Sequence, residues 1–256
     1  MRNITKSIPE KKLTEILIRR AGRNNTGKVT AGSRGGGFKR FYRMIDFKRD
    51  KYDVSGKIVA LEYDPNRNVE IALVLYEDGE KRYILSPLGI KVGDTIISSQ
   101  KLIEAKLGNA MKLQYVPIGT PIHNIELHIN KGGQIVRGAG TLATVLATDS
   151  GFVQVKLPSG EIRQIPQDCM ATVGQLANTE WKTTPIGSAG RARRMGIRPH
   201  VRGTAQDPRS HPHGGGEGRS GEGMHPKTPW GKPARGLKTR KKGKYSDRFI
   251  IKRRGK

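Results

Sequence analysis

The stretch that decides the fold runs from residue 57 to residue 86 and reads KIVALEYDPNRNVEIALVLYEDGEKRYILS. Asp64-Pro65-Asn66 is a turn signal inside it. Further on lies Asp78-Gly79, a pair that tolerates the positive φ of a tight hairpin turn. Between and around these turns are three short β-rich segments, at Lys57–Tyr63, Asn68–Tyr76 and Lys81–Ser86. The stretch therefore predicts strands joined by turns, with a hairpin at its end.

Strand signals continue along the chain with no long helix between them. We expect further strands at Asp94–Ser98, Met111–Val116, Ile122–Ile129, Gly140–Thr148, Phe152–Leu157 and Glu161–Pro166. A break bounded by proline and glycine near Pro117–Pro121 divides the series. So many short strands predict an all-β fold of two small barrels. One larger sandwich is the alternative, and the break favours two barrels.

The excess of positive charge lies at the two ends of the chain. The 256 residues carry 48 basic and 22 acidic side chains, a formal net charge of +26. Residues 1–54 hold 15 basic and 5 acidic side chains, residues 191–256 hold 20 and 4, and the middle holds 13 of each. Self-repulsion of this size disfavours compaction without counter-charge, so the arms indicate a polyanionic partner.

The composition excludes several classes of protein. The single cysteine, Cys169, rules out an intramolecular disulfide framework and a four-cysteine zinc site. The longest apolar run, Ile71 to Tyr76, is too short to span a bilayer. The N-terminus shows no signal-peptide pattern, so we expect no secretion. The C-terminal arm lacks the wide apolar face of a membrane-surface helix, which favours nucleic acid over a membrane.

Both arms are rich in glycine. The first contains Gly32-Ser-Arg34-Gly35-Gly36-Gly37-Phe38-Lys39-Arg40, and residues 191–256 contain 12 Gly and 6 Pro. Such segments bury too little apolar area to offset their ordering entropy, so we expect them to order against a partner. Ser7-x-x-Glu10 resembles a capping box, and propensity favours helix and coil equally there.

Two glycine motifs imitate nucleotide-binding sites. Gly22-Arg-Asn-Asn-Thr-Gly27-Lys28 follows the P-loop pattern, but Val29 stands where Ser or Thr would hold magnesium. Gly216-Glu-Gly218-Arg-Ser-Gly221 has the G-x-G-x-x-G spacing, yet it follows no predicted strand and opens no predicted helix. We interpret the first as a turn and the second as chance spacing in a glycine-rich arm.

The most distinctive string is His211-Pro-His213-Gly-Gly-Gly-Glu217-Gly-Arg219, with His225 nearby. Three histidines and Glu217 could ligate a metal, but Pro212 and the glycines make a poor preformed cage. Either His211 or His213 could serve as a general base, yet no recognisable scaffold completes such a site. The glycines suit close approach of backbone amides to phosphates or bases, which fits packing against RNA.

The remaining features favour a folded RNA. Aromatic residues are too scarce for a reader that stacks successive single-stranded bases. No recognition helix or zinc finger is predicted for a DNA major groove. Long glycine-rich arms suit RNA that is read by shape and phosphate, and the planar fork of arginine can bridge two phosphate oxygens. The second arm supplies such arginines at close spacing, at Arg191, Arg193, Arg194, Arg198 and Arg202.

Further motifs accompany the string from His211 to Arg219. In chain order they are Gly22-Arg-Asn-Asn, Arg34-Gly-Gly-Gly, Ile45-Asp-Phe-Lys-Arg49, Glu62-Tyr-Asp-Pro-Asn-Arg67, Glu80-Lys-Arg-Tyr-Ile-Leu85, Gly119 to Glu126, Lys131-Gly-Gly-Gln-Ile-Val-Arg137, Arg198-Pro to Arg202-Gly, and Thr228-Pro-Trp-Gly231. Together these motifs resemble one known family, the bacterial-type second protein of the large ribosomal subunit. The resemblance covers essentially the whole chain, and the string from His211 to Arg219 is its most specific part.

The resemblance implies an OB-fold followed by an SH3-like barrel. It implies a structural constituent of the large subunit: a primary rRNA binder that supports subunit assembly and association, tRNA binding and the architecture of the peptidyl-transferase region. Peptide-bond formation would not be catalysed by the protein. The implied division is a basic arm at 1–54, an OB-fold at 55–120, an SH3-like barrel at 121–190 and a basic extension at 191–256.

The resemblance also implies partners and a location. The partners are large-subunit (23S-type) rRNA, neighbouring ribosomal proteins, and small-subunit rRNA through an intersubunit bridge. We expect no membrane partner and no homo-oligomer. The location would be a cytoplasmic ribosome, with an organelle ribosome left open. The N-terminus begins later than the usual family pattern, so we expect some peripheral rRNA contacts to be missing.

The family's rRNA-contacting positions and its much-discussed histidine map onto individual residues. Adding the arm cations, the predicted rRNA-binding set is Arg34, Arg40, Arg49, Lys51, Arg67, Arg82, Arg137, Arg191, Arg193, Arg194, Arg198, Arg202, His211, His213, Arg219, Lys241, Lys242, Arg253 and Arg254. The family histidine is His211. Ser210 stands where the family usually has an acidic residue, and Asp207 is the nearest carboxylate before it. This weakens any scheme in which an adjacent carboxylate orients the imidazole.

We expect no metal site and no cofactor, apart from magnesium ions that accompany rRNA. Two rival interpretations stay open from the residues alone. One is an enzyme in which His211, His213 and Glu217 serve hydrolysis or acyl transfer. The other is a nucleoid or single-strand DNA binder that uses the first barrel.

Overall fold

The computed structural model describes residues 4–149 and 151–255 and divides the chain into two compact units. The barrel unit comprises Met1–Leu17, Lys39–Pro185 and Ser246–Lys256. The arm unit comprises Ile18–Phe38 and Ile186–Tyr245, so it contains parts of both glycine-rich arms.

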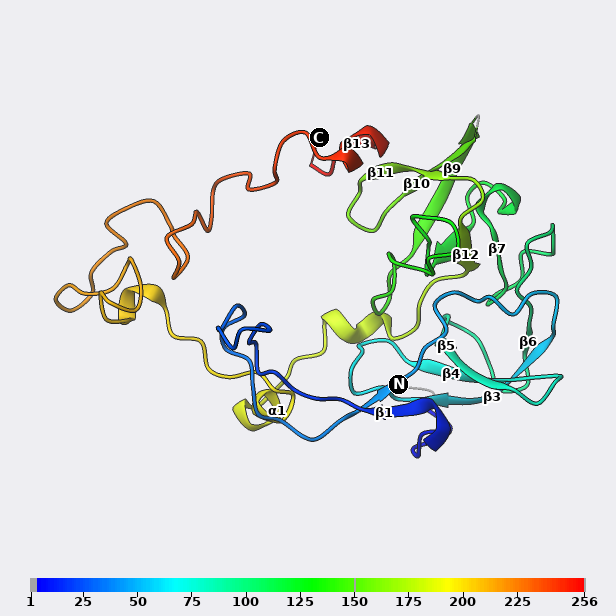
Figure 1. The fold of residues 1–256 in the computed structure, drawn as a ribbon, viewed down its shortest axis with the longest axis horizontal. Helices are drawn as coiled ribbons and strands as arrows, with labels where there is room; N and C mark the ends of the chain where they lie inside the picture. Colours follow the sequence, from blue (N-terminus) through cyan, green and yellow to red (C-terminus); the bar gives the residue numbers. More distant parts are fainter. Residues whose placement is uncertain (1–3, 150, 256) are drawn as a thin grey trace. The chain divides into compact units, whose positions relative to one another are not determined.

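A four-stranded antiparallel sheet forms the first part of the barrel unit (Figure 1). Its central strand β4 packs Ala72 and Val74 into one apolar cluster and Ile71 and Leu73 into another. Because β4 is buried on both sides, its sequence is continuously apolar instead of alternating. The strand order is β5 (Lys81–Leu85), β4 (Ile71–Tyr76), β3 (Gly56–Glu62) and β6 (Thr95–Ile96).

A seven-stranded antiparallel sheet forms the second part of the barrel unit. Val145, Val153, Val155 and Ile165 pack into its core, together with the buried Cys169. Burial raises the pKa of the Cys169 thiol to about 12, so this cysteine is an inert core residue. The strand order is β13 (Ile250–Lys252), β11 (Ile162–Pro166), β10 (Phe152–Lys156), β9 (Ala143–Asp149), β8 (Pro121–His123), β12 (Met170–Val173) and β7 (Ala110–Lys112).

The expectation of an all-β protein is confirmed, and the architecture is consistent with an OB-like barrel followed by an SH3-like barrel. Several strands are shorter than predicted. The stretch Met111–Val116 is strand only to Lys112 and then forms a 3₁₀ turn, Leu113–Tyr115. The stretch Ile122–Ile129 is strand only at β8, to His123. The four-part division at residues 54, 120 and 190 stays a prediction.

The sequence after Ser7-x-x-Glu10 was equally compatible with helix and coil, and no α-helix forms there. Lys11–Leu13 is a 3₁₀ turn, and β1 (Thr14–Ile16) then pairs with β2 (Phe41–Arg43). Tertiary contacts explain the outcome. The Glu10 N–H donates to Tyr83 Oη at 2.8 Å, and the Glu10 carboxylate accepts from Lys81 Nζ at 3.1 Å. Residues of β5 therefore bind both the main-chain N–H and the carboxylate of Glu10, the residue expected to take part in the capping box.

The arm unit has no apolar core among its described residues. All four apolar clusters lie in the barrel unit, and His211 and His213 are the two buried residues described in the arm unit. Its α-helix, α1 (Ala189–Arg194), begins where Ser188 Oγ accepts from the Arg191 N–H at 3.2 Å. The composition of the arms predicts this scarcity of buried apolar area, but the short helix was not predicted.

His123 makes the stability of the barrel unit depend on pH. Its ring is fully buried, and Nδ1 lies 2.8 Å from the Gly174 carbonyl oxygen, to which it donates. Burial lowers the pKa of His123 from 6.5 to about 4. Between pH 6.5 and about pH 4, His123 binds a proton in the unfolded chain but not in the folded chain. The folded state therefore loses stability as the pH falls through this range.

We therefore expect the free energy of unfolding to fall by about 2–3 kcal/mol between pH 7 and pH 4.5 through this residue. Urea titrations of the unmodified chain, of His123→Asn and of His200→Asn check it. His123→Asn removes this component, whereas the exposed His200 serves as the control. Equal pH dependence of all three chains would show that His123 contributes nothing.

A candidate RNA interface

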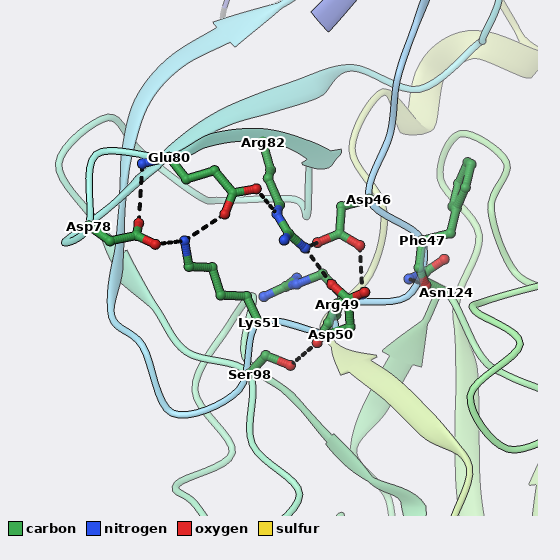
Figure 2. Close-up of polar contacts among 10 residues, drawn as sticks. All are labelled: Asp46, Phe47, Arg49, Asp50, Lys51, Asp78, Glu80, Arg82, Ser98 and Asn124. Atoms are coloured by element: carbon green, nitrogen blue, oxygen red, sulfur yellow. Dashed lines mark hydrogen bonds and ion pairs between the residues drawn. The ribbon is translucent and has the colours of Figure 1, made fainter.

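Three of the predicted rRNA-binding cations lie in one network on the barrel unit (Figure 2). Arg82 on β5 donates to Glu80 Oε1 at 2.6 Å and to Asp46 Oδ2 at 3.1 Å, and it also pairs with Asp50. One guanidinium therefore joins the turn before β5 to the loop at 46–50. These carboxylates occupy Nε and Nη1 of the guanidinium.

Lys51 belongs to the same network. Its ammonium donates to Glu80 Oε2 at 2.7 Å, pairs with Asp78 and lies 4.6 Å from the centre of the Tyr76 ring. The Asp78-Gly79 turn that the sequence predicts is thus held in place by a lysine. Only 10% of the Lys51 side chain is exposed.

The network shifts the pKa values of its members in favour of the charged forms. Partial burial opposes the charge on Arg82, but bonds to Glu80, Asp50 and Asp46 outweigh it and raise the pKa. The same balance raises the pKa of Lys51. The bond to Lys51 lowers the pKa of Asp78, and the bond to Arg82 lowers that of Glu80.

Arg49, the third of these cations, is buried at 3% exposure. Its N–H donates to Asp46 Oδ1 at 2.7 Å, its carbonyl accepts from Ser98 Oγ at 2.6 Å, and Nη2 donates to the Gly108 carbonyl at 3.2 Å. Its φ of +56° is unusual for a residue with a side chain. The bond that Arg49 donates to Asp46 and the bond that it accepts from Ser98 hold this strained backbone, so the loop is fixed at Arg49.

Arg67 and Arg137 form a different arrangement, in which two guanidinium groups share the Phe47 ring. Their central carbons lie 5.1 Å and 4.5 Å from its centre. Arg67 Nε pairs at 3.1 Å with the fully buried Asp64. Arg137 donates to the Gly133 carbonyl. Among the described residues, no carboxylate forms an ion pair with it. Burial and then the charge of Arg67 lower the pKa of Arg137. The two neighbouring positive charges of Arg67 and Arg137 favour the binding of an anion beside them.

The predicted cations of the arms are mostly exposed. Arg40 is half-buried and donates to the Pro65 carbonyl at 2.7 Å. The arm unit as a whole holds 20 basic and 3 acidic side chains, so its charge has few internal partners. The exposed members of the predicted set are Arg34, Arg191, Arg193, Arg194, Arg198, Arg202, Arg219, Lys241 and Lys242, with Arg253 and Arg254 on the barrel unit.

His213 is a fully bonded histidine of the arm unit. The Lys227 N–H donates to Nε2 at 2.7 Å, so Nε2 carries no proton. Nδ1 therefore holds the ring proton and donates it to the Glu222 carbonyl at 3.1 Å. With both ring nitrogens engaged by main chain, the neutral imidazole joins two turns of the arm.

His211 is held by one ring hydrogen bond and by close packing. Its Nδ1 accepts from the His213 N–H at 3.1 Å, and the two rings lie 5.2 Å apart. A Cβ on Gly203 would come within 2.5 Å of the ring, so Gly203 permits the packing. Asp207 contacts His211 through its main-chain oxygen, while its carboxylate accepts from the Arg209 N–H at 2.8 Å. The nearest carboxylate in sequence is thus committed to a turn.

The glycines after His213 have an internal role that the sequence interpretation missed. A Cβ on Gly214 would lie 2.5 Å from the Asp207 carbonyl oxygen, and one on Gly215 would lie 2.8 Å from Pro208 Cγ. These positions need glycine for the arm to pack on itself. Within residues 4–149 and 151–255, no group of three or more His, Cys, Asp or Glu side chains could hold a metal ion.

The Gly22–Lys28 motif forms a turn in the first arm, as expected, but the arginines around it were not among the predicted RNA-binding residues. Arg19, Arg20 and Arg23 line one hollow with Asn24, whose Oδ1 accepts from the Thr26 and Lys28 N–H groups at 3.0 and 2.9 Å. The signal was present in the Gly22–Lys28 motif.

The geometry defines an RNA-binding protein with folded barrels and exposed basic arms. Residues 10–98 match Ribosomal Proteins L2, RNA binding N-terminal domain, and residues 106–231 match Ribosomal Proteins L2, C-terminal domain. The chain therefore belongs to the family of ribosomal proteins L2, as its sequence motifs predict.

The family assignment settles several expectations. This is a family of structural RNA-binding proteins and not of enzymes, so the enzyme interpretation of the histidines is wrong. The partner is large-subunit rRNA, the protein lies in the ribosome, and the family has no intrinsic cofactor. In the described part of the chain, no helix is long and apolar enough to cross a membrane.

The network of Figure 2 predicts that Arg82 stabilises the barrel unit. Arg82→Gln leaves Asp46, Asp50 and Glu80 without their shared partner, and we expect a loss of about 1–3 kcal/mol in the free energy of unfolding. Urea denaturation measures it. Arg254→Gln removes the same charge from an exposed site and serves as the control. Equal stability of the two variants would contradict a structural role for Arg82.

Proposed function

We propose that this chain acts as a primary rRNA scaffold whose arms carry most of the phosphate contacts. The observation that supports this most strongly is the imbalance of the arm unit, with 20 basic and 3 acidic side chains. On the barrel unit, by contrast, Lys51 and Arg82 have carboxylate partners. Phosphates are the counter-charge that the arms lack.

The scaffold would support subunit assembly and association, tRNA binding and the architecture of the peptidyl-transferase region. Neighbouring ribosomal proteins and small-subunit rRNA, through an intersubunit bridge, would be its further partners. Magnesium ions that accompany rRNA would share the site. A bacterial cytoplasm is the location that fits the bacterial-type motifs, and an organelle ribosome is the alternative.

The roles of the predicted cations follow from their surroundings. We assign direct phosphate contacts to the exposed arm arginines and to Arg137, whose guanidinium lies over the same Phe47 ring as that of the paired Arg67. Arg49, Lys51 and Arg82 would act indirectly, by fixing the loop and turn that flank the interface. The bonds of His211 and His213 to their own chain favour a packing role for both.

The salt dependence of rRNA binding tests this proposal. With six to ten phosphate contacts, the unmodified chain should lose roughly 10³–10⁵ in affinity between 50 and 200 mM salt, by analogy with duplex DNA. Filter binding to a large-subunit rRNA transcript over that range gives the slope. A flat salt response would contradict the proposal.

Matched charge changes then locate the phosphate-binding cations. Replacing Arg191, Arg193, Arg194 and Arg198 by Gln should reduce the slope by up to about 0.9 for each phosphate that is no longer neutralised. Replacing four exposed lysines of the barrel unit by Gln removes the same charge and should leave the slope nearly unchanged: Lys57, Lys91, Lys101 and Lys156. An equal reduction in the two variants would show that net charge, and not the arm, determines binding.

A further inference from the structure

Two segments far apart in the sequence pair with each other in the arm unit. The Gly35 N–H donates to the Gly196 carbonyl at 3.0 Å, and the Arg198 N–H donates to the Ser33 carbonyl at 2.9 Å. The Phe38 N–H donates to the Arg194 carbonyl at 3.1 Å. We call this pair of segments, Ser33–Phe38 and Arg194–Arg198, the arm clasp. It joins the arms that the sequence presents as separate.

Gly37 is the position where the two arms come closest. Its φ is +82°, and a Cβ there would lie 2.6 Å from the Arg194 carbonyl oxygen and 2.9 Å from the Gly196 nitrogen. The neighbouring Gly36 also has a positive φ, +65°, but a Cβ on it would meet nothing within 4 Å. The two glycines therefore share a backbone conformation, and only Gly37 is needed for the contact between arms.

The clasp brings together cations without carboxylates. Residues 18–38 and 186–200 contain nine basic and no acidic side chains. Apolar packing does not offset the repulsion, since the ring of Phe38 is 66% exposed and no residue of these two segments is buried. A few water-exposed main-chain bonds between such segments are weak, so a closed clasp needs counter-charge from outside the protein.

We propose that the arm clasp closes on the phosphate backbone of RNA, so that the two arms form one composite RNA site. Arg34 comes from the first arm, and Arg194 and Arg198 come from the second. An RNA strand fits better than an anionic membrane because the clasp offers clustered cations and no buried apolar face. The inference rests on the proposed rRNA scaffold and adds that the arms bind cooperatively.

A pair of glycine variants tests the clasp without changing any charge. Gly37→Ala places a methyl group against the second arm, whereas Gly36→Ala has the same kind of backbone strain and no contact. We expect Gly37→Ala to bind the rRNA transcript about tenfold or more weakly with a smaller salt slope, and Gly36→Ala to change affinity about twofold or less. Equal affinities of the two variants would overturn the proposal.

A double-mutant cycle gives a second, independent readout. Arg34→Gln and Arg194→Gln lie on opposite arms, so in the unmodified chain their effects on affinity should be non-additive. In the Gly37→Ala background, where the clasp is open, the two effects should add. Additive effects in both backgrounds would refute a composite site.

Two controls separate the possible failures. Thermal unfolding of the barrel unit should be the same in all variants, since the substitutions lie in the arm unit. If the unmodified chain shows no salt-dependent rRNA binding, the scaffold itself is wrong. If that binding is intact but Gly37→Ala matches Gly36→Ala, only the clasp is wrong.

Discussion

Repulsion among the arm cations is the constraint on which the rest of the structure depends. The barrel unit pairs several of its own cations internally: Arg82 and Lys51 face four carboxylates, and Arg67 pairs with the buried Asp64. The arm unit has three acidic residues for 20 basic ones, so it cannot do the same. Under the proposed function, its conformation depends on a partner that carries negative charge.

The barrels supply what the arms lack. Four apolar clusters give the barrel unit its own cores, and buried Arg49 and its carboxylate partner Asp46 fix the loop that leads into β3. Stability and binding are thus placed on different parts of one chain. The folded platform pairs many of its own charges, and in the proposed scaffold the arm segments offer theirs to the RNA.

Local sequence signals were sufficient where contacts are local. The strands from Lys57 to Leu85 and their Asp78-Gly79 turn were predictable because apolar content and turn chemistry act over a few residues. The region near Ser7 could not be decided in this way, because Tyr83 and Lys81, far along the chain, take both groups of Glu10. Strand β13 was missed because its partner β11 lies almost ninety positions earlier.

The candidate site also has features that the sequence predicts and features that depend on distant contacts. Charge counting identified the arms, since net charge needs no structure. It could not show that Arg82 has three carboxylate partners or that His213 is bonded at both nitrogens, because those partners come from other turns. Nor could glycine content alone distinguish Gly37, where a Cβ would meet the other arm, from Gly36, where a Cβ would meet nothing.

Sedimentation of the full chain tests the central claim most directly. A cell lysate is run on a sucrose gradient in magnesium, with and without ribonuclease, and the chain is followed by immunoblot. The account predicts co-sedimentation with the large subunit that disappears on ribonuclease treatment. A chain that stays in the light fractions under both conditions would contradict it.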